Sequence, residues 1–291
     1  VRFEVTSEPG RLATACLAAA PPLSRARDSA GVRIVENDAP AGLPFTLDSV
    51  PAYDIGPAGG PESEFISSPV SALRLANRRI AAAGWAMTEV KLFDSTGRWL
   101  RTIGRSGGGP GEFEALGFVF QGGGDSITTF EPGTQRLQRW TGDLEFVDLS
   151  LLVTPAIKPG ASVRGTFGDG SLLLHASRPG NSAPTDPVMR NVVTLFRRTV
   201  TESPWDSVVA YPSAPAVRDP QYVGSSLGNA LFAPMPNFSV RGSRLAFTNG
   251  ARFEIEIRSP TGGLRMIVRR TAAPRAVTEN EVDRAVQFWA A

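Results

Sequence analysis

The residues of this chain whose types and spacing could support chemistry are two glycine-rich stretches, one histidine and one cysteine. The stretches IGPAGGPESEF (55–65) and IGRSGGGPGEF (103–113) have the glycine density of loops that bind phosphate through backbone N–H groups. Neither contains the Gly-Lys-Ser/Thr of a Walker loop, and LGFVFQ after the second has strand character rather than helix character. We therefore expect no nucleotide binding and no cofactor.

The single histidine and cysteine restrict catalytic and metal chemistry. One cysteine, Cys16, allows no internal disulfide and no cysteine-built metal site. One histidine, His175, excludes a multi-histidine zinc or iron site and leaves Ser-His-Asp chemistry only through that residue. We predict no catalytic residue and no metal.

The N-terminal region suggests export. LATAC resembles a bacterial lipoprotein cleavage box in which Cys16 is the lipidated residue, although the preceding RFEVTSEPGR is too polar for the apolar part of a signal. We expect residues 1–31 to be a leader or degenerate export signal with a linker over 21–30. The expected location is exported, periplasmic or cell-envelope, with cytoplasmic as the alternative. The chain has no run of 18 apolar residues, so we predict no transmembrane segment.

Composition favours a globular protein of many short strands. Apolar residues make up 42% of the chain, and 30 glycines and 24 prolines suit frequent turns. The 30 basic and 28 acidic residues are scattered and give a net charge of +2. A nucleic-acid-binding protein usually concentrates its basic residues, so nucleic acid is not an expected partner.

The elements that would position any site form a repeat. The two Ile-Gly stretches are 48 residues apart, and between and after them short apolar strands alternate with turns. Four units of four strands can be recognised, beginning near residues 66, 115, 162 and 238. Four-stranded antiparallel units at this spacing are typical of β-propeller blades, which bury their faces against one another. About six such blades would fill a chain of this size.

The segment KLFDSTGRWLRTIGRSGGGPGEF (91–113) resembles the repeat of NHL-type propellers, and resembles more closely that of bacterial six-bladed TolB-like propellers. The resemblance implies an all-β, six-bladed fold and says little about function. We assign residues 32–272 to blades and 273–291 to a C-terminal helix with a capping box at Thr278 and Glu281. Four full blades over 65–272 and an outer strand over 45–56 predict an open, C-terminally truncated ring.

Repetition of the glycine-rich stretch indicates a structural role. Ile55 and Ile103 would end outer strands, and Phe65 and Phe113 would pack between blades. Glu112 would accept loop N–H groups, with cation binding at the rim as the alternative. The structural motif comprises Ile103, Gly104, Gly109, Pro110, Gly111, Glu112 and Phe113.

Two long excursions, 175–190 and 212–237, are expected on the face that also carries the 104–113 crossing, and long loops often carry function. The candidate binding residues are Trp85, His175, Arg178, Arg190, Arg218, Asp219 and Tyr222. Structural alternatives are a plug between blades for Trp85 and a capped loop histidine for His175.

Two functions remain open from the sequence. The first is a non-catalytic binding or scaffold propeller of the bacterial cell envelope, whose partner is an unknown small molecule, peptide or protein. The second is a propeller hydrolase or lyase that uses carboxylates, with calcium as an option, on the long-loop face. Convergence of three or more carboxylates on the propeller axis would favour the enzyme.

Overall fold

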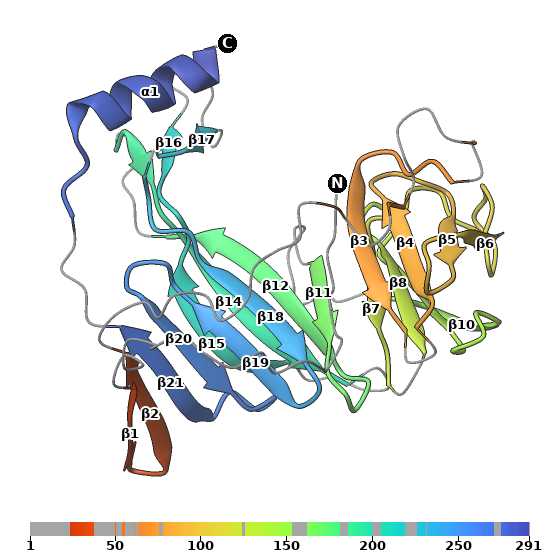
Figure 1. Ribbon diagram of the computed structural model, residues 1–291, viewed down its shortest axis with the longest axis horizontal. Coiled ribbons are helices and arrows are strands. Elements are labelled where there is room, and N and C mark those ends of the chain that lie inside the picture. Colours follow the sequence, from red (N-terminus) through yellow and green to blue (C-terminus); the bar gives the residue numbers. More distant parts are fainter. Residues whose placement is uncertain are drawn as a thin grey trace, which may run out of the picture. The chain divides into compact units, whose positions relative to one another are not determined.

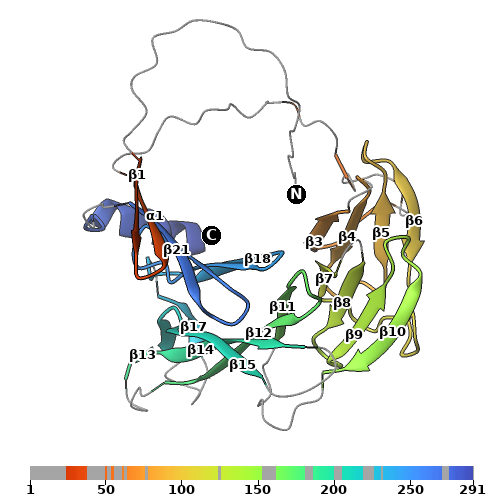
Figure 2. The same cartoon turned by 90° about the horizontal axis from the view of Figure 1, so that it is seen from below.

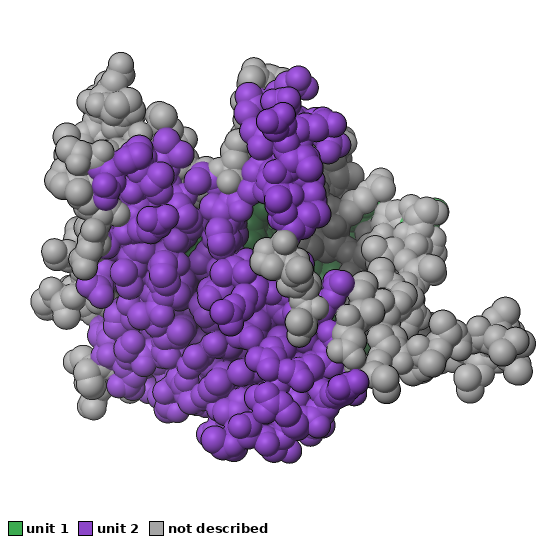
Figure 3. All heavy atoms as spheres, turned by 90° about the vertical axis from the view of Figure 1, so that its left-hand side faces the viewer, with its two compact units in different colours: residues 1–21, 42–158, 162–172 green, residues 22–41, 159–161, 173–291 purple. Residues whose placement is uncertain are grey.

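Over the residues it describes, the computed structural model is all-β apart from one helix, and most of its strands form four-stranded antiparallel sheets like the blades of a β-propeller (Figure 1). It describes residues 24–37, 50, 54–55, 61, 64–75, 78–123, 126–152, 162–180, 186–199, 205–218, 226–230, 232–270 and 275–290. The chain divides into two compact units (Figure 3). Unit 1 comprises residues 1–21, 42–158 and 162–172, and unit 2 comprises residues 22–41, 159–161 and 173–291.

Unit 1 contains two four-stranded blades at the predicted positions. The first has the order β3-β4-β5-β6 and the second the order β10-β9-β8-β7, with antiparallel pairing throughout. The strands are β3 (Pro69–Arg74), β4 (Ile80–Gly84), β5 (Val90–Phe93), β6 (Trp99–Ile103), β7 (Phe118–Gln121), β8 (Ile127–Glu131), β9 (Arg136–Trp140) and β10 (Phe146–Leu151). Turn residues fix these hairpins: the Asp94 carboxylate accepts hydrogen bonds from the backbone N–H groups of Thr96 and Arg98, as an Asx turn does.

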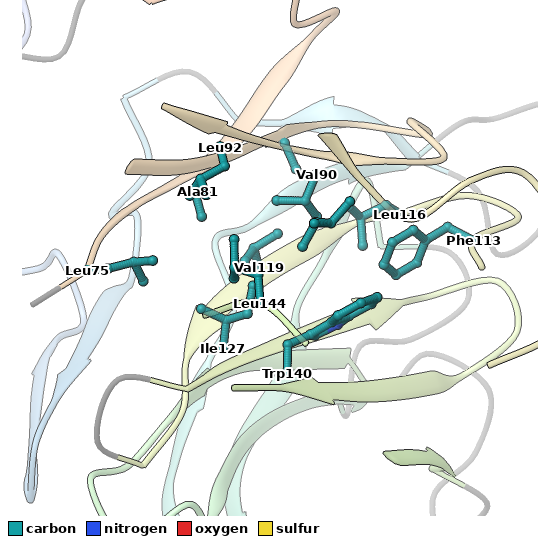
Figure 4. Close-up of a cluster of buried hydrophobic side chains, with 12 residues drawn as sticks. Leu75, Ala81, Val90, Leu92, Phe113, Leu116, Val119, Ile127, Trp140 and Leu144 are labelled. Carbon is teal, nitrogen blue, oxygen red and sulfur yellow. The ribbon is translucent and has the colours of Figure 1, made fainter. Parts of the chain in front are cut away.

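The two blades of unit 1 bury a shared apolar core, as propeller blades must (Figure 4). The first blade contributes Val90 and Leu92, and the second contributes Ile127 and Trp140. Phe113, on the crossing between them, is fully buried in this core. The prediction for Phe113 is therefore confirmed.

Two further blades follow. Their strand orders are β11-β12-β14-β15 and, within a larger sheet, β21-β20-β19-β18. The strands are β11 (Ser162–Thr166), β12 (Leu172–Pro179), β14 (Asn191–Arg198), β15 (Asp206–Pro212), β18 (Asn237–Arg241), β19 (Arg244–Thr248), β20 (Glu254–Arg258) and β21 (Leu264–Arg270). In unit 2 the Tyr211 and Phe247 rings lie 4.9 Å apart, so β15 packs against β19. The described residues thus contain four blades, and the six-bladed type stays a prediction.

The last blade is extended by a hairpin that the sequence analysis did not predict. β1 (Ser24–Ser29) and β2 (Val32–Asn37) form an antiparallel hairpin, and β2 pairs in parallel with β21 to give a six-stranded sheet (Figure 2). Ala30 and Gly31 have φ of 49° and 78°, the positive values that a two-residue turn of type I′ requires. The expected linker over 21–30 is therefore wrong at Ser24–Ser29, because this turn closes a strand pair.

Other expectations at the ends of the propeller have mixed outcomes. α1 (Glu279–Ala290) forms where predicted, and Thr278 and Glu281 make the reciprocal hydrogen bonds of a capping box. Val282 and Val286 on this helix are exposed. The predicted strand over 45–56 lies mostly outside the described residues. Phe65 is 47% exposed, so its predicted burial between blades is wrong.

Candidate functional site

Within the glycine-rich crossing, Glu112 accepts hydrogen bonds from other residues of the same segment. Glu112 accepts a hydrogen bond from the backbone N–H of Gly109 at 2.9 Å and another from the Arg105 guanidinium at 2.8 Å. These two donors, the Gly109 N–H first, lower the pKa of the Glu112 carboxyl. Glu112 thus accepts a loop N–H group, as the structural interpretation expects, and the cation-binding alternative stays untested.

Buried polar side chains from the second blade also hydrogen-bond to the crossing. Gln138 Nε2 and Arg136 Nη2 donate to the Glu112 carbonyl at 2.7 and 3.1 Å. Glu131, 1% exposed, accepts from the Glu114 N–H at 2.7 Å and pairs with Arg136 at 3.5 Å. These charged groups are buried with partners, which is how buried ions persist in a core. Their hydrogen bonds and ion pair join the second blade to the crossing.

Short strands in the two long excursions pair with each other. β13 (Val188–Met189), in the first excursion, pairs with β16 (Ala216–Arg218), in the second, and β16 pairs with β17 (Ser226–Asn229). The two excursions therefore meet in a small sheet within unit 2. Whether they share a face with the crossing in unit 1 stays a prediction.

The structure places the predicted long-loop residues as follows. Strand β12 continues past His175, so this residue is not a loop histidine; its ring stacks on Phe238, with centroids 6.3 Å apart and planes at 23°. Arg178 and Arg190 are exposed, and Arg218 lies in β16. Asp219 and Tyr222 lie outside the described residues.

Trp85 occupies a rigid turn between β4 and β5. Its N–H donates to the Ser68 carbonyl at 2.9 Å, and the N–H of Ala86 donates to the Leu116 carbonyl at 2.9 Å. The N–H of Leu116 in turn donates to the Met87 carbonyl at 2.8 Å, so hydrogen bonds join the turn to Leu116, which follows the crossing. Ala86 has φ of 58°, a left-handed conformation that costs free energy in a residue other than glycine. The side chain of Trp85 is nevertheless 51% exposed, so the plug interpretation is wrong.

Trp85 belongs to an aromatic–arginine cluster in unit 1, which we define as Trp85, Phe118, Phe120 and Arg164. The Trp85 and Phe118 rings meet edge to face, with centroids 6.1 Å apart and planes at 77°. Phe118 and Phe120 are stacked at 5.7 Å, and the Arg164 guanidinium carbon lies 5.3 Å from the Phe118 centroid. Edge-to-face rings and a cation over a ring face are both favourable arrangements.

Local sequence explains how the strands present this cluster. In β7 the side chain of Val119 is buried in the core of unit 1, so Phe118 and Phe120 project together from the opposite face of the strand. In β11 the same alternation buries Val163 and leaves Arg164 exposed. The sequence analysis missed these three residues, although the pattern FVF contained the alternation.

The described part of the chain offers little for metal chemistry. No group of three or more His, Cys, Asp or Glu side chains within it is arranged to hold a metal ion. Among the described residues, no helix has the length and apolar character needed to cross a membrane.

Comparison with known proteins yields no family. No family model matches the chain, and no curated protein does so either. Matching solved structures are propeller-like. One is a protein of Bacteroides fragilis thought to be exported, with a TM-score of 0.42 and 14% identity. Two others are a streptogramin B lyase, with a TM-score of 0.37 and 13% identity, and a catalytically inactive virginiamycin B lyase of Staphylococcus aureus with quinupristin, with a TM-score of 0.35 and 12% identity. The three structures cover 78%, 75% and 66% of this chain, which spans only 58%, 58% and 64% of theirs. The propeller assignment rests on the sheets themselves, and the function has to be argued from the site.

Proposed function

We propose that this protein is a non-catalytic binding propeller of the bacterial cell envelope that recognises its ligand through the aromatic–arginine cluster. The observation that carries the proposal is the half-exposed Trp85 side chain on a turn fixed by backbone hydrogen bonds. An exposed indole does not contribute the packing that a buried one would, so a folding role explains it poorly. A ligand that covers it would gain that packing.

Rigidity makes the cluster suited to binding. The free energy cost of ordering a side chain on association is smaller when the backbone is fixed and the neighbouring ring already limits rotation. Here the turn is held from both sides and Phe118 lies against Trp85. Aromatic residues and arginine are also the side chains that most often dominate binding free energy.

The hydrolase or lyase alternative has less support. It needs carboxylates that converge, and for the calcium version the described residues contain no group of three or more His, Cys, Asp or Glu side chains that could hold a metal ion. His175 packs against the face of Phe238.

The envelope location is supported by the LATAC sequence, in which Cys16 would carry the lipid. Metabolic labelling of the full-length natural protein in a bacterial host with a palmitate analogue tests this part. Label that depends on Cys16 is expected, and unlabelled protein in the cytoplasm would contradict it.

A thermal-shift screen against sugars, peptides, small aromatic compounds and divalent cations tests the binding function. Compounds that stabilise the wild type are expected to lose their effect on Trp85→Ala. Phe253→Ala is the matched control, because Phe253 is 66% exposed and is also covered by an arginine, Arg270, at 5.8 Å. Stabilisation that survives Trp85→Ala would place binding elsewhere, and turnover of a stabilising compound would overturn the non-catalytic assignment.

A further inference from the structure

We infer that the aromatic–arginine cluster binds a ligand with a flat ring and an attached anionic group, a carboxylate or a phosphate. This inference rests on the proposed binding function and adds the chemical class of the ligand. It comes from an exposed indole and a guanidinium that both contact one phenylalanine ring, Phe118.

The ring requirement follows from Trp85. The indole already meets Phe118 by an edge-to-face contact, and half of its surface remains exposed. A flat ring in the ligand would cover that surface by stacking, as aromatic side chains do with one another. Phe118 is itself covered by the stacked Phe120 ring and by Arg164, so Trp85 is the ring most available to a ligand.

The anion requirement follows from Arg164. Its guanidinium carbon lies 5.3 Å from the Phe118 centroid, and the Trp85 centroid lies 6.1 Å from the same ring, so both groups border one phenylalanine ring. A guanidinium has five N–H donors, so an arginine can contact more than one group at a time. Arginine binds carboxylates and phosphates in a planar, charge-assisted geometry. The buried Val163 beside Arg164 fixes the strand that presents it.

Three probes that share one naphthalene ring separate the two requirements by isothermal titration: 2-naphthoate, 2-naphthylmethanol and 2-naphthylmethylammonium, which are anionic, neutral and cationic. We expect 2-naphthoate to bind at least about tenfold more tightly than the cationic probe, a difference of about 1.4 kcal/mol. Trp85→Ala should weaken binding of 2-naphthoate at least about tenfold as well, with Trp85→Phe intermediate. Arg164→Gln should remove the preference for the anion, and Arg164→Lys should keep part of it.

Two controls and a folding check make the result decisive. Arg270→Gln and Phe253→Ala alter the isolated cation–ring pair in unit 2 and should leave all three affinities unchanged. Each variant is compared with the wild type by near-ultraviolet circular dichroism and urea unfolding. Equal affinity for the three probes, or a preference that survives Arg164→Gln, would overturn the assignment of an anionic ligand and leave the binding function standing. If none of the three probes binds, the ring-and-anion class is overturned. If the thermal-shift screen finds no compound whose stabilising effect depends on Trp85, the binding function itself is overturned.

Discussion

The ring of Phe113 lies against the backbone of Gly104 so closely that a β-carbon at residue 104 would approach the ring to 2.3 Å. Gly104 has φ of 81°, so the chain at this point also needs a conformation that residues with side chains rarely adopt. The crossing between the first two blades therefore depends on one glycine and one phenylalanine together. The first two predictions test this pair.

Phe113→Ala should destabilise the protein by about 3–5 kcal/mol, because it empties a fully buried site between two blades. The measurement is the free energy of unfolding in urea. The control is Phe253→Ala, which removes a ring that is 66% exposed and should change stability much less. Equal stability of the Phe113 variant and the wild type would contradict the packing role of the crossing.

Gly104→Ala should destabilise by more than about 1 kcal/mol, since the new methyl group meets the Phe113 ring and the backbone is strained. Gly133→Ala is the matched control, because a β-carbon there meets nothing within 4 Å. The two variants are compared by thermal unfolding. A Gly104 variant as stable as the Gly133 variant would show that the crossing can relax around a side chain.

Glu131→Ala should cost about 3–5 kcal/mol, because it leaves the Arg136 guanidinium, 6% exposed, without its buried carboxylate. It also removes the acceptor for the Glu114 N–H. Asp148→Ala breaks the exposed ion pair with Arg139 and should cost less than about 1 kcal/mol. Urea unfolding of both variants checks the contrast, and similar losses would argue against a role for the buried pair.

The sequence predicted the repeated parts of the fold well. Each of the sixteen predicted strands of the four blades has its counterpart among β3–β12, β14–β15 and β18–β21, because alternation and turn residues are local signals. The β1–β2 hairpin was missed. Its pairing with β21 joins segments more than 200 residues apart, which no local pattern reports. Phe65 differs from Phe113 in its surroundings: Phe113 lies between two described blades, whereas Phe65 precedes the first of them.

The site was predicted only in part. Trp85 was singled out from its position in a turn, but its partners come from two other strands, β7 and β11. Which face of a strand carries the exposed residues depends on how its sheet packs, and the core around Val119 decides this for Phe118 and Phe120. His175 was singled out because it is unique, and the structure stacks it on Phe238.

The start of α1 should be sensitive to acid. Hydrogen bonds from Arg275 and from Thr278 lower the pKa of Glu281 from its ordinary 4.5 to about 2. A depressed carboxyl pKa stabilises the folded helix above pH 4.5, and this stabilisation is lost as the pH falls from 4.5 through about 2. Amide exchange of Val282, whose N–H donates to the Thr278 carbonyl, should be slower in the wild type than in Glu281→Gln at pH 6, and the difference should shrink as the pH falls toward 2. A difference that does not change with pH would contradict this assignment.

Binding at Trp85 is the central claim, and fluorine NMR of protein labelled with 5-fluorotryptophan tests it most directly. The chain has five tryptophans, and the Trp85 resonance is identified by its absence from Trp85→Phe. On titration with 2-naphthoate, or with a compound found in the thermal-shift screen, the Trp85 resonance should shift to saturation while the buried Trp140 resonance stays in place. Saturable binding that leaves the Trp85 resonance unchanged would contradict the account.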